Sequence, residues 1–244
     1  MSPFGMYFDR VAVINLPSRP DRLKSVRDEI EKLGIPKEAI EVPYAPIPHD
    51  DGGFPSRGVY GNYLSHLGIL QAALAAGTKR LLVLEDDAIF SCVARDSLQQ
   101  AKILQEVEGQ EWSMWHLGHK LRSELKNCPK GVIPNAMEFH WAHAYAVHGD
   151  SLGELIIFLE DSMARPAGYG VGKMYIDGAF YHYRAEVCSK PCLVSNPALS
   201  VQKGSDSSLA GPSLPGVVSW RHLPREIARK MRDELWRRTN YHLR

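Results

Sequence analysis

The chain has 244 residues, enough for one large α/β domain or for a domain with an extension. Its hydrophobic content of 44% and charged content of 23% are ordinary for a soluble globular protein, and the formal net charge of +1 gives no sign of a nucleic-acid partner. No apolar run approaches the ~18 residues of a membrane-spanning helix, and the first residues lack the basic and apolar regions of a signal peptide. We therefore expect a cytoplasmic protein with free thiols.

The first third of the chain alternates apolar runs with amphipathic segments. Residues 11–16 predict a buried strand, and Pro20 opens a helix whose apolar residues recur at spacings of three and four until Gly34 ends it. Four further elements are expected here: a weak strand at 40–44, a loop at 46–58, a helix at about 60–76 and a strand at 81–84. The alternation favours a mainly parallel sheet with right-handed crossovers, and the loop is either a cover over a site or a plain connection.

Periodic elements continue to Arg165, and the composition changes after it. Those expected up to Arg165 are a helix at 94–107, strands near 114–117 and 142–147, and a helix through 152–159. Beyond that point Gly, Pro and Ser are frequent, and only short stretches at 174–176 and around Val187 stand out. A Ser/Gly/Pro-rich segment, 203–216, precedes a basic helix at about 222–238. We therefore expect one domain over 1–215 and a helical extension over 216–244.

The last 26 residues carry most of the charge asymmetry, because Ser219 to Arg244 contains eight Lys/Arg and three Asp/Glu. Arginines of the expected helix are interleaved with apolar residues such as Leu235 and Trp236. A basic amphipathic helix can lie on an anionic membrane surface, here the inner face of the cytoplasmic membrane. The same apolar stripe can equally pack on the domain.

Residues 81–88 read Leu-Leu-Val-Leu-Glu-Asp-Asp-Ala, a short apolar run that ends in three carboxylates. The run has the length and composition of a buried strand, and open α/β sheets bind ligands beyond the carboxyl ends of their strands. Adjacent like charges repel, so the cluster favours a compensating divalent cation; the alternative is a solvated acidic turn. The four cysteines include a C-x₃-C pair, Cys188 and Cys192, but no second pair completes a zinc site.

Several segments between about residues 11 and 208 fit one pattern in one order. They are Val13-Ile14-Asn15-Leu16 with Arg19-Pro20-Asp21-Arg22, Gly61-Asn62-Tyr63-Leu64-Ser65-His66-Leu67, Leu82–Ala88, the strand ending Leu117-Gly118, Ala144–Val147, Asp177 in Ile-Asp-Gly, and Pro197 through Gln202 to Ser205-Asp206. The ordered set resembles glycosyltransferase family 25, which contains bacterial lipopolysaccharide and lipooligosaccharide galactosyl- and glucosyltransferases and collagen galactosyltransferases. The sequence departs from the family's pattern at Tyr63, at 140–143 and at Ser207, and these departures bear on acceptor specificity more than on the fold.

The resemblance implies an α/β, GT-A-like nucleotide-sugar fold with a mainly parallel central sheet flanked by helices. It also implies a UDP-sugar donor, Mn²⁺ or Mg²⁺, and transfer with inversion to a saccharide acceptor such as a lipopolysaccharide core. Galactose is the first expectation for the donor sugar and glucose the second. A catalytically silent sugar- or nucleotide-binding module of the same fold is the alternative, and a metal-dependent diphosphate hydrolase is a third hypothesis.

The donor side of the site is expected at the ends of the first and third strands. Glu85-x-Asp87 has the form of a D-x-D element, so Asp87 is the predicted metal ligand. Glu85 either shares the metal or contacts ribose, and Asp86 is a further substrate-binding candidate. The family resemblance places Asn15 and Leu16 beside the nucleotide. Arg19 or Arg22 then contacts the base or diphosphate, the alternative being a surface charge at a helix start.

The acceptor side is expected to contain the catalytic base. Asp177 is the predicted base of an inverting transfer, the alternatives being an acceptor-binding residue or the cap of a local turn. Ser65 and His66 are substrate-binding candidates near the start of a helix, although a lone histidine there is often structural. The late polar set is assigned to the donor or metal side and comprises Gln202, Ser205 and Asp206. Five histidines match no metal motif and are expected to be mostly structural: residues 116, 119, 140, 143 and 148.

Overall fold

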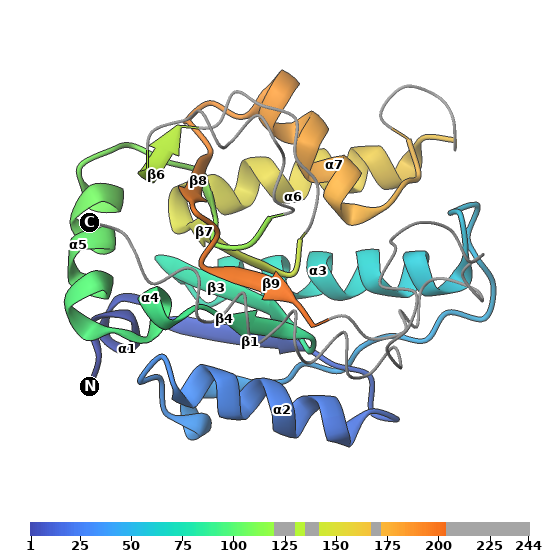
Figure 1. Cartoon of the computed structure of the whole chain (residues 1–244). Coiled ribbons are helices and arrows are strands. Elements are labelled where there is room, and N and C mark those ends of the chain that lie inside the picture. Colours follow the sequence, from blue (N-terminus) through green and yellow to red (C-terminus); the bar gives the residue numbers. More distant parts are fainter. Residues whose placement is uncertain (120–129, 135–141, 167–171, 204–244) are drawn as a thin grey trace, which may run out of the picture.

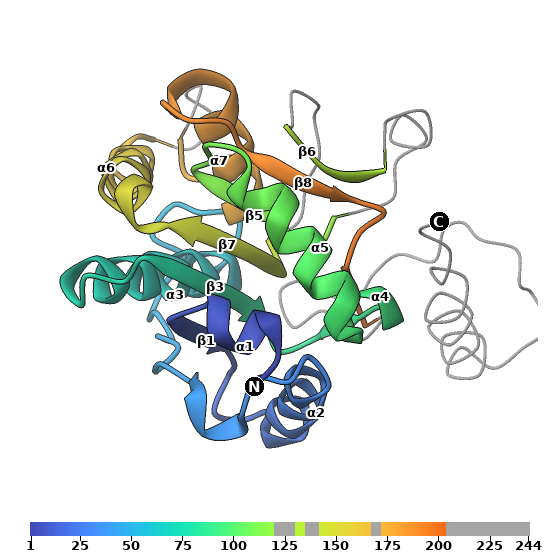
Figure 2. The same cartoon turned by 90° about the vertical axis from the view of Figure 1, so that its left-hand side faces the viewer.

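A computed structural model describes residues 1–119, 130–134, 142–166 and 172–203. Within them a seven-stranded sheet of order β2-β1-β3-β7-β5-β8-β6 lies between two layers of helices (Figures 1 and 2). Its strands are β1 (Arg10–Ile14), β2 (Ile40–Glu41), β3 (Arg80–Glu85), β5 (Met114–His116), β6 (Gly131–Pro134), β7 (Ala144–His148) and β8 (Leu193–Asn196). β2, β1 and β3 are parallel, as are β5 and β8, whereas β7 is antiparallel to both its neighbours and β6 to β8. Five of the seven strands therefore share one direction, which confirms the predicted mainly parallel, GT-A-like α/β sheet.

The central strand β3 explains why the apolar run at 81–84 has no polar alternation. Leu81 to Leu84 are all fully buried, with Leu82 and Leu84 in one hydrophobic cluster and Leu81 and Val83 in the other. Successive side chains of a strand point to opposite faces, so both faces of this strand must be covered.

Helices cover both faces of the sheet, as Figure 2 shows. The first face is covered by α1 (Pro3–Tyr7), α2 (Pro20–Glu31), α4 (Cys92–Arg95) and α5 (Ser97–Glu108). The second face is covered by α3 (Arg57–Ala75), α6 (Gly149–Ala164) and α7 (Ile176–His182), which continues into the π-helix η3 (Tyr183–Val187). A short 3₁₀ helix, η1 (Lys37–Ala39), precedes β2. No helix in the described part of the chain is long and apolar enough to cross a membrane.

Two helix starts differ from the sequence expectation, each because of a capping side chain. Ser56 Oγ accepts a hydrogen bond from Val59 N at 3.2 Å, so α3 begins at Arg57 and not near residue 60. Asp96 Oδ1 accepts from Gln99 N at 2.9 Å, and this cap divides the helix expected at 94–107 into α4 and α5.

A second sheet pairs two strands that the sequence analysis did not predict, β4 (Ala88–Phe90) and β9 (Ser200–Gln202). They are antiparallel, and Ala88 lies opposite Gln202. Lys203 N also donates to Asp87 O at 2.7 Å. This ladder brings the segment before residue 204 to the acidic end of β3. The predicted basic helix at 222–238 and the boundary at 215 lie outside the described residues.

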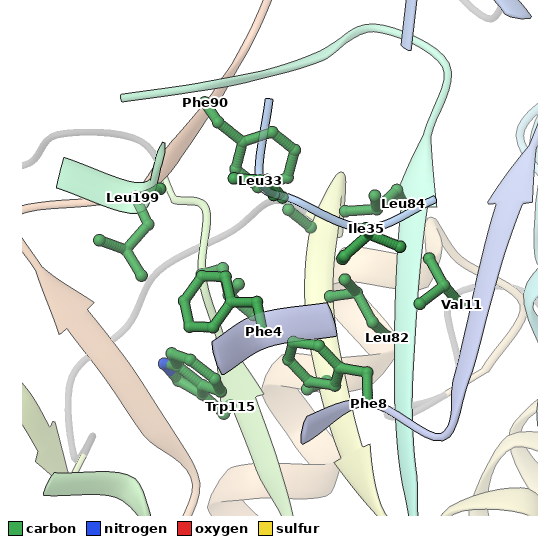
Figure 3. Close-up of a cluster of buried hydrophobic side chains, with 14 of the residues drawn as sticks. Phe4, Phe8, Val11, Leu33, Ile35, Leu82, Leu84, Phe90, Trp115 and Leu199 are labelled. Carbon is green, nitrogen blue, oxygen red and sulfur yellow. The ribbon is translucent and has the colours of Figure 1, made fainter. Parts of the chain in front are cut away.

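Aromatic side chains from α1 and its C-cap Phe8 pack in the core beside β5 and β3 (Figure 3). Phe4 is fully buried, and its ring centroid lies 5.9 Å from that of Phe8 and 6.1 Å from that of Trp115. The short helix α1 is therefore an integral part of the core.

Replacing Phe4 with alanine should lower the free energy of unfolding by about 3–5 kcal/mol, because the change removes a fully buried ring and leaves a cavity. Urea unfolding followed by circular dichroism measures the change. Leu98→Ala is the control, since this side chain is 75% exposed and its loss should change stability by less than about 0.5 kcal/mol. Equal losses in the two variants would contradict the packing described for α1.

Candidate functional site

The candidate site is a cavity of about 380 Å³ at the carboxyl ends of β1 and β3. Parallel pairing sets Ile14 opposite Glu85, so the residues that follow each strand meet at one edge of the sheet. Ligands of open α/β sheets bind at such edges. The lining residues are Ile14, Asn15, Leu16, Ser18, Arg22, Ala45, Pro46, Ile47, Pro48, Arg57, Gly58, Gly61, Asn62, Ser65, Glu85, Asp86, Asp87 and Gln202.

Glu85 is held by hydrogen bonds from three side chains. Its Oε1 accepts from Asn62 Nδ2 at 3.3 Å and lies 3.4 Å from His66 Nε2. Its Oε2 accepts from Gln202 Nε2 at 3.0 Å. Burial raises the pKa of Glu85, but the hydrogen bonds and nearby histidines outweigh it, so the pKa is lowered overall. Glu85 is therefore an ionised and tightly oriented carboxylate.

His66 is fully buried behind Glu85 and does not line the cavity. Its Nδ1 lies 2.8 Å from the Tyr145 hydroxyl while its Nε2 faces Glu85. If Nε2 carries the proton and donates to Glu85, Nδ1 accepts from the tyrosine. The contacts described for His66 orient Glu85 and do not reach into the cavity.

Asp86 and Asp87 differ in how far a neighbouring positive charge compensates them. Asp86 Oδ1 forms an ion pair with Arg22 NH1 at 3.1 Å, and both side chains are 11% exposed. Burial still raises the pKa of Asp86, and the charge of Glu85 adds to it. For Asp87, burial and the charges of Glu85 and Asp86 raise the pKa to about 7. Its Oδ1 is buried and has no hydrogen-bond partner among the described residues.

Three buried oxygens without a hydrogen-bond partner belong to residues of this cavity: Asn15 Oδ1, Asn62 Oδ1 and Asp87 Oδ1. All three are acceptors, and unsatisfied buried acceptors are costly, so they fit an oxygen-binding cation or a hydrogen-bonding ligand. No three His, Cys, Asp or Glu side chains among the described residues are grouped to hold a metal by themselves. Mg²⁺ commonly binds one or two carboxylates together with substrate phosphates, and this donor set fits that mode.

One wall of the cavity comes from the proline-rich loop before α3, so this loop covers the cavity and is more than a connection. Gly61 allows the close approach, because a Cβ there would lie 2.9 Å from Pro46 O. Sequence reasoning missed Arg57, Gly58, Gly61 and Asn62 as lining residues. A signal existed, since these residues and Ser65 form a stripe of polar or small side chains at helical spacing, opposite the apolar face.

Most predicted donor-side residues gather at the cavity, whereas three predicted site residues in the described part of the chain do not line it. Arg19 pairs with Asp21 at 2.8 Å on the surface, and His66 lies behind the wall. Asp177 lies in the first turn of α7, where its Oδ1 accepts from Gly178 N at 2.9 Å. Gln202 does line the cavity, but its predicted companions Ser205 and Asp206 lie outside the described residues. The role of Asp177 stays a prediction.

Curated relatives match part of the chain. "Inactive glycosyltransferase 25 family member 3" from Homo sapiens is 27% identical over 168 residues, which covers 59% of this chain and 28% of the relative. "Probable inactive glycosyltransferase 25 family member 3" from Bos taurus is 28% identical with the same coverage. The chain is similar to members of glycosyltransferase family 25. The match spans little more than a quarter of each family 25 relative, and no family model matches the chain.

Two solved structures cover most of the chain at low sequence identity. A glycosyltransferase involved in glycosylation of the major capsid of PBCV-1 has a TM-score of 0.48 and 12% identity, covering 77% of this chain and 81% of its own. Mannose-1-phosphate geranyltransferase from Thermus thermophilus has a TM-score of 0.38 and 17% identity, covering 76% and 72%. TM-scores this low do not support a fold assignment by themselves. The assignment depends on the strand order described above.

The raised pKa of Asp87 predicts how its removal changes stability with pH. The folded state binds a proton at Asp87 up to a pH of about 7, whereas the unfolded chain releases it near 3.8. This carboxylate therefore destabilises the fold progressively as the pH rises between those values. Asp87→Asn removes the charge, so its Tm relative to wild type, without divalent cations, should increase from about pH 5 to about pH 8.

The control for this experiment is Asp161→Asn, which changes an exposed carboxylate on α6. Its Tm should follow the wild-type pH dependence. If Asp87→Asn also follows it, the carboxylate is not desolvated as described.

Proposed function

We propose that this chain is a glycosyltransferase that binds a UDP-sugar and a divalent cation in the cavity at the ends of β1 and β3. The sugar is galactose, with glucose as the second choice, and the acceptor is a saccharide such as a lipopolysaccharide core. The observation that carries the proposal is the buried Asp87 oxygen, which has no partner among the described residues and lies beside a hydrogen-bonded Glu85 and an arginine-paired Asp86. At Asp87 Oδ1 the site therefore lacks a compensating positive charge from the described residues.

Two features of the cavity wall support an anionic ligand bound together with a cation. Among the described residues, Arg57 makes no ion pair, and it lines the cavity at the start of α3. Arg22 approaches from the start of α2 and already holds Asp86. A diphosphate can then lie between these guanidinium groups and the cation bound at Asp87, since arginine matches phosphate geometry well.

The chain's own residues have separate tasks in the proposed transfer. Asp87, with Asn15 and Asn62 nearby, would hold the cation, and the bound cation would supply charge stabilisation for the departing diphosphate. Glu85 is held by its hydrogen bonds and orients Gln202 at the cavity wall. The acceptor hydroxyl attacks the anomeric carbon while the bond to the UDP oxygen breaks. Asp177 takes the hydroxyl proton in this proposal.

A catalytically silent binding module is the second candidate, because the human and bovine relatives described above carry the word inactive in their names. Such a protein would keep the donor cavity and lack turnover. Glu85, Asp86 and Asp87 are compatible with both candidates, so a measurement of turnover decides between them.

Release of UDP from UDP-galactose and UDP-glucose, with Mn²⁺ and a panel of saccharide acceptors, tests the proposal. A transferase releases UDP fully only when an acceptor is present, and a hydrolase releases it without one. Asp87→Asn should abolish release, whereas Asp161→Asn should leave it unchanged. Binding of UDP without release from any donor would favour the silent module and contradict the proposal.

Asp177→Asn tests the assignment of the base. It preserves the shape of the side chain but removes the proton acceptor, so kcat should fall by a factor of order 10²–10⁴ while the Kd for UDP stays constant. Steady-state kinetics and calorimetry give the two values. A near-normal kcat with a raised acceptor KM would make Asp177 an acceptor-binding residue, and a weaker Kd for UDP would move it to the donor side.

A further inference from the structure

Two cysteines lie together beside the second helical layer, and neither lines the cavity. Cys188 caps the end of η3, and Cys192 immediately precedes β8. Both are free thiols, and the Cys192 Sγ lies 3.8 Å from the Cys188 Sγ. Neither residue is used by the proposed transfer.

The segment between the two cysteines is held in place by neighbouring side chains. Ser113 Oγ donates to Lys190 O at 3.1 Å and lies 3.1 Å from Cys192 Sγ. Glu154 on α6 accepts from Ser189 N at 3.1 Å. The two sulfurs are therefore held near each other by the fold, and closing them to the ~2.05 Å of a disulfide needs only a small movement.

The two thiols differ in reactivity. Cys188 is half-buried, whereas Cys192 is only 3% exposed. The hydrogen bond from Cys192 lowers the pKa of Cys188 to about 7, with help from Ser113 and Arg184 against burial and the charge of Glu154. The same contact and burial raise the pKa of Cys192. Since the thiolate is the nucleophile, Cys188 is the attacking residue and Cys192 the resolving one.

We propose that Cys188 and Cys192 form a reversible intramolecular disulfide in exchange with low-molecular-weight disulfides such as glutathione disulfide. The Cys188 thiolate attacks one sulfur of glutathione disulfide, forms a mixed disulfide and displaces one glutathione thiolate. Cys192 loses its proton to solvent and attacks the Cys188 sulfur, displacing the second glutathione. The pair loses two electrons and the oxidant gains them as two glutathione thiols, so the exchange balances.

The bond would join the end of the α7–η3 segment to the start of β8. Arg184 in this segment lies 3.2 Å from His116 Nε2 on β5, and Asp177 lies at its beginning. Oxidation therefore acts on the element that carries the proposed base.

The test is mass spectrometry of the folded wild-type chain after incubation with glutathione disulfide. Trypsin does not cut before proline, so the Lys190-Pro191 bond stays intact and both cysteines fall on the single peptide 185–203. Cys92 and Cys128 lie on other tryptic peptides. The peptide 185–203 should lose two hydrogens and carry no glutathione, and reduction with dithiothreitol should reverse the change.

Two variants define the roles of the sulfurs. Cys192→Ser should accumulate a stable glutathione adduct on Cys188, because the resolving thiol is absent. Cys188→Ser should react slowly or not at all, because Cys192 is buried. A stable adduct on the wild-type peptide, an unmodified wild-type peptide, or equal reactivity of the two single variants would each overturn the proposal. The wild-type measurement decides even if a variant fails to fold.

Discussion

Three consecutive carboxylates at the end of a buried strand impose the main electrostatic constraint on this fold. Two of them are compensated by different parts of the chain, and these contacts place α2, α3 and β9 around the cavity. α3 and β9 supply hydrogen-bond donors to Glu85, and α2 supplies the guanidinium that pairs with Asp86. Of the three, Asp87 has no partner at Oδ1 within the described part of the chain. Buried like charges at this spacing are unfavourable, and this is why the proposed cation is placed at Asp87.

The fold was predictable wherever one local pattern determined an element. Strand β3 followed from an apolar run of strand length, and α2 from its proline start and periodic apolar residues. β8 and β9 could not be predicted in this way, because they are short and are stabilised by pairing with strands distant in sequence. The start of α3 was missed because the Ser56 cap lies inside a segment that reads as loop.

In the candidate site, too, local sequence patterns predicted some side-chain positions and not others. Asn15 and Asp87 were predictable as neighbours, since the carboxyl ends of adjacent parallel strands meet at one edge. The position of His66 behind Glu85 depends on Tyr145 from β7, and no spacing within α3 encodes that contact. Gln202 came from the family resemblance alone, and the β4–β9 ladder gives the physical reason for its place.

In the proposed function, the donor cavity and the base Asp177 belong to different elements of the molecule. The cavity is formed at the ends of β1 and β3, whereas Asp177 and the cysteine pair lie on the segment from α7 to β8. A relative could therefore lose turnover and keep the donor cavity. This separation makes the word inactive in the relatives' names compatible with a preserved fold.

The most direct test of the central claim is a crystal structure with UDP and Mn²⁺, using anomalous scattering to locate the metal. A manganese peak is expected within coordination distance of an Asp87 carboxylate oxygen, with the nucleotide between Arg22 and Arg57. UDP bound without manganese at Asp87, or bound outside this cavity, would contradict it.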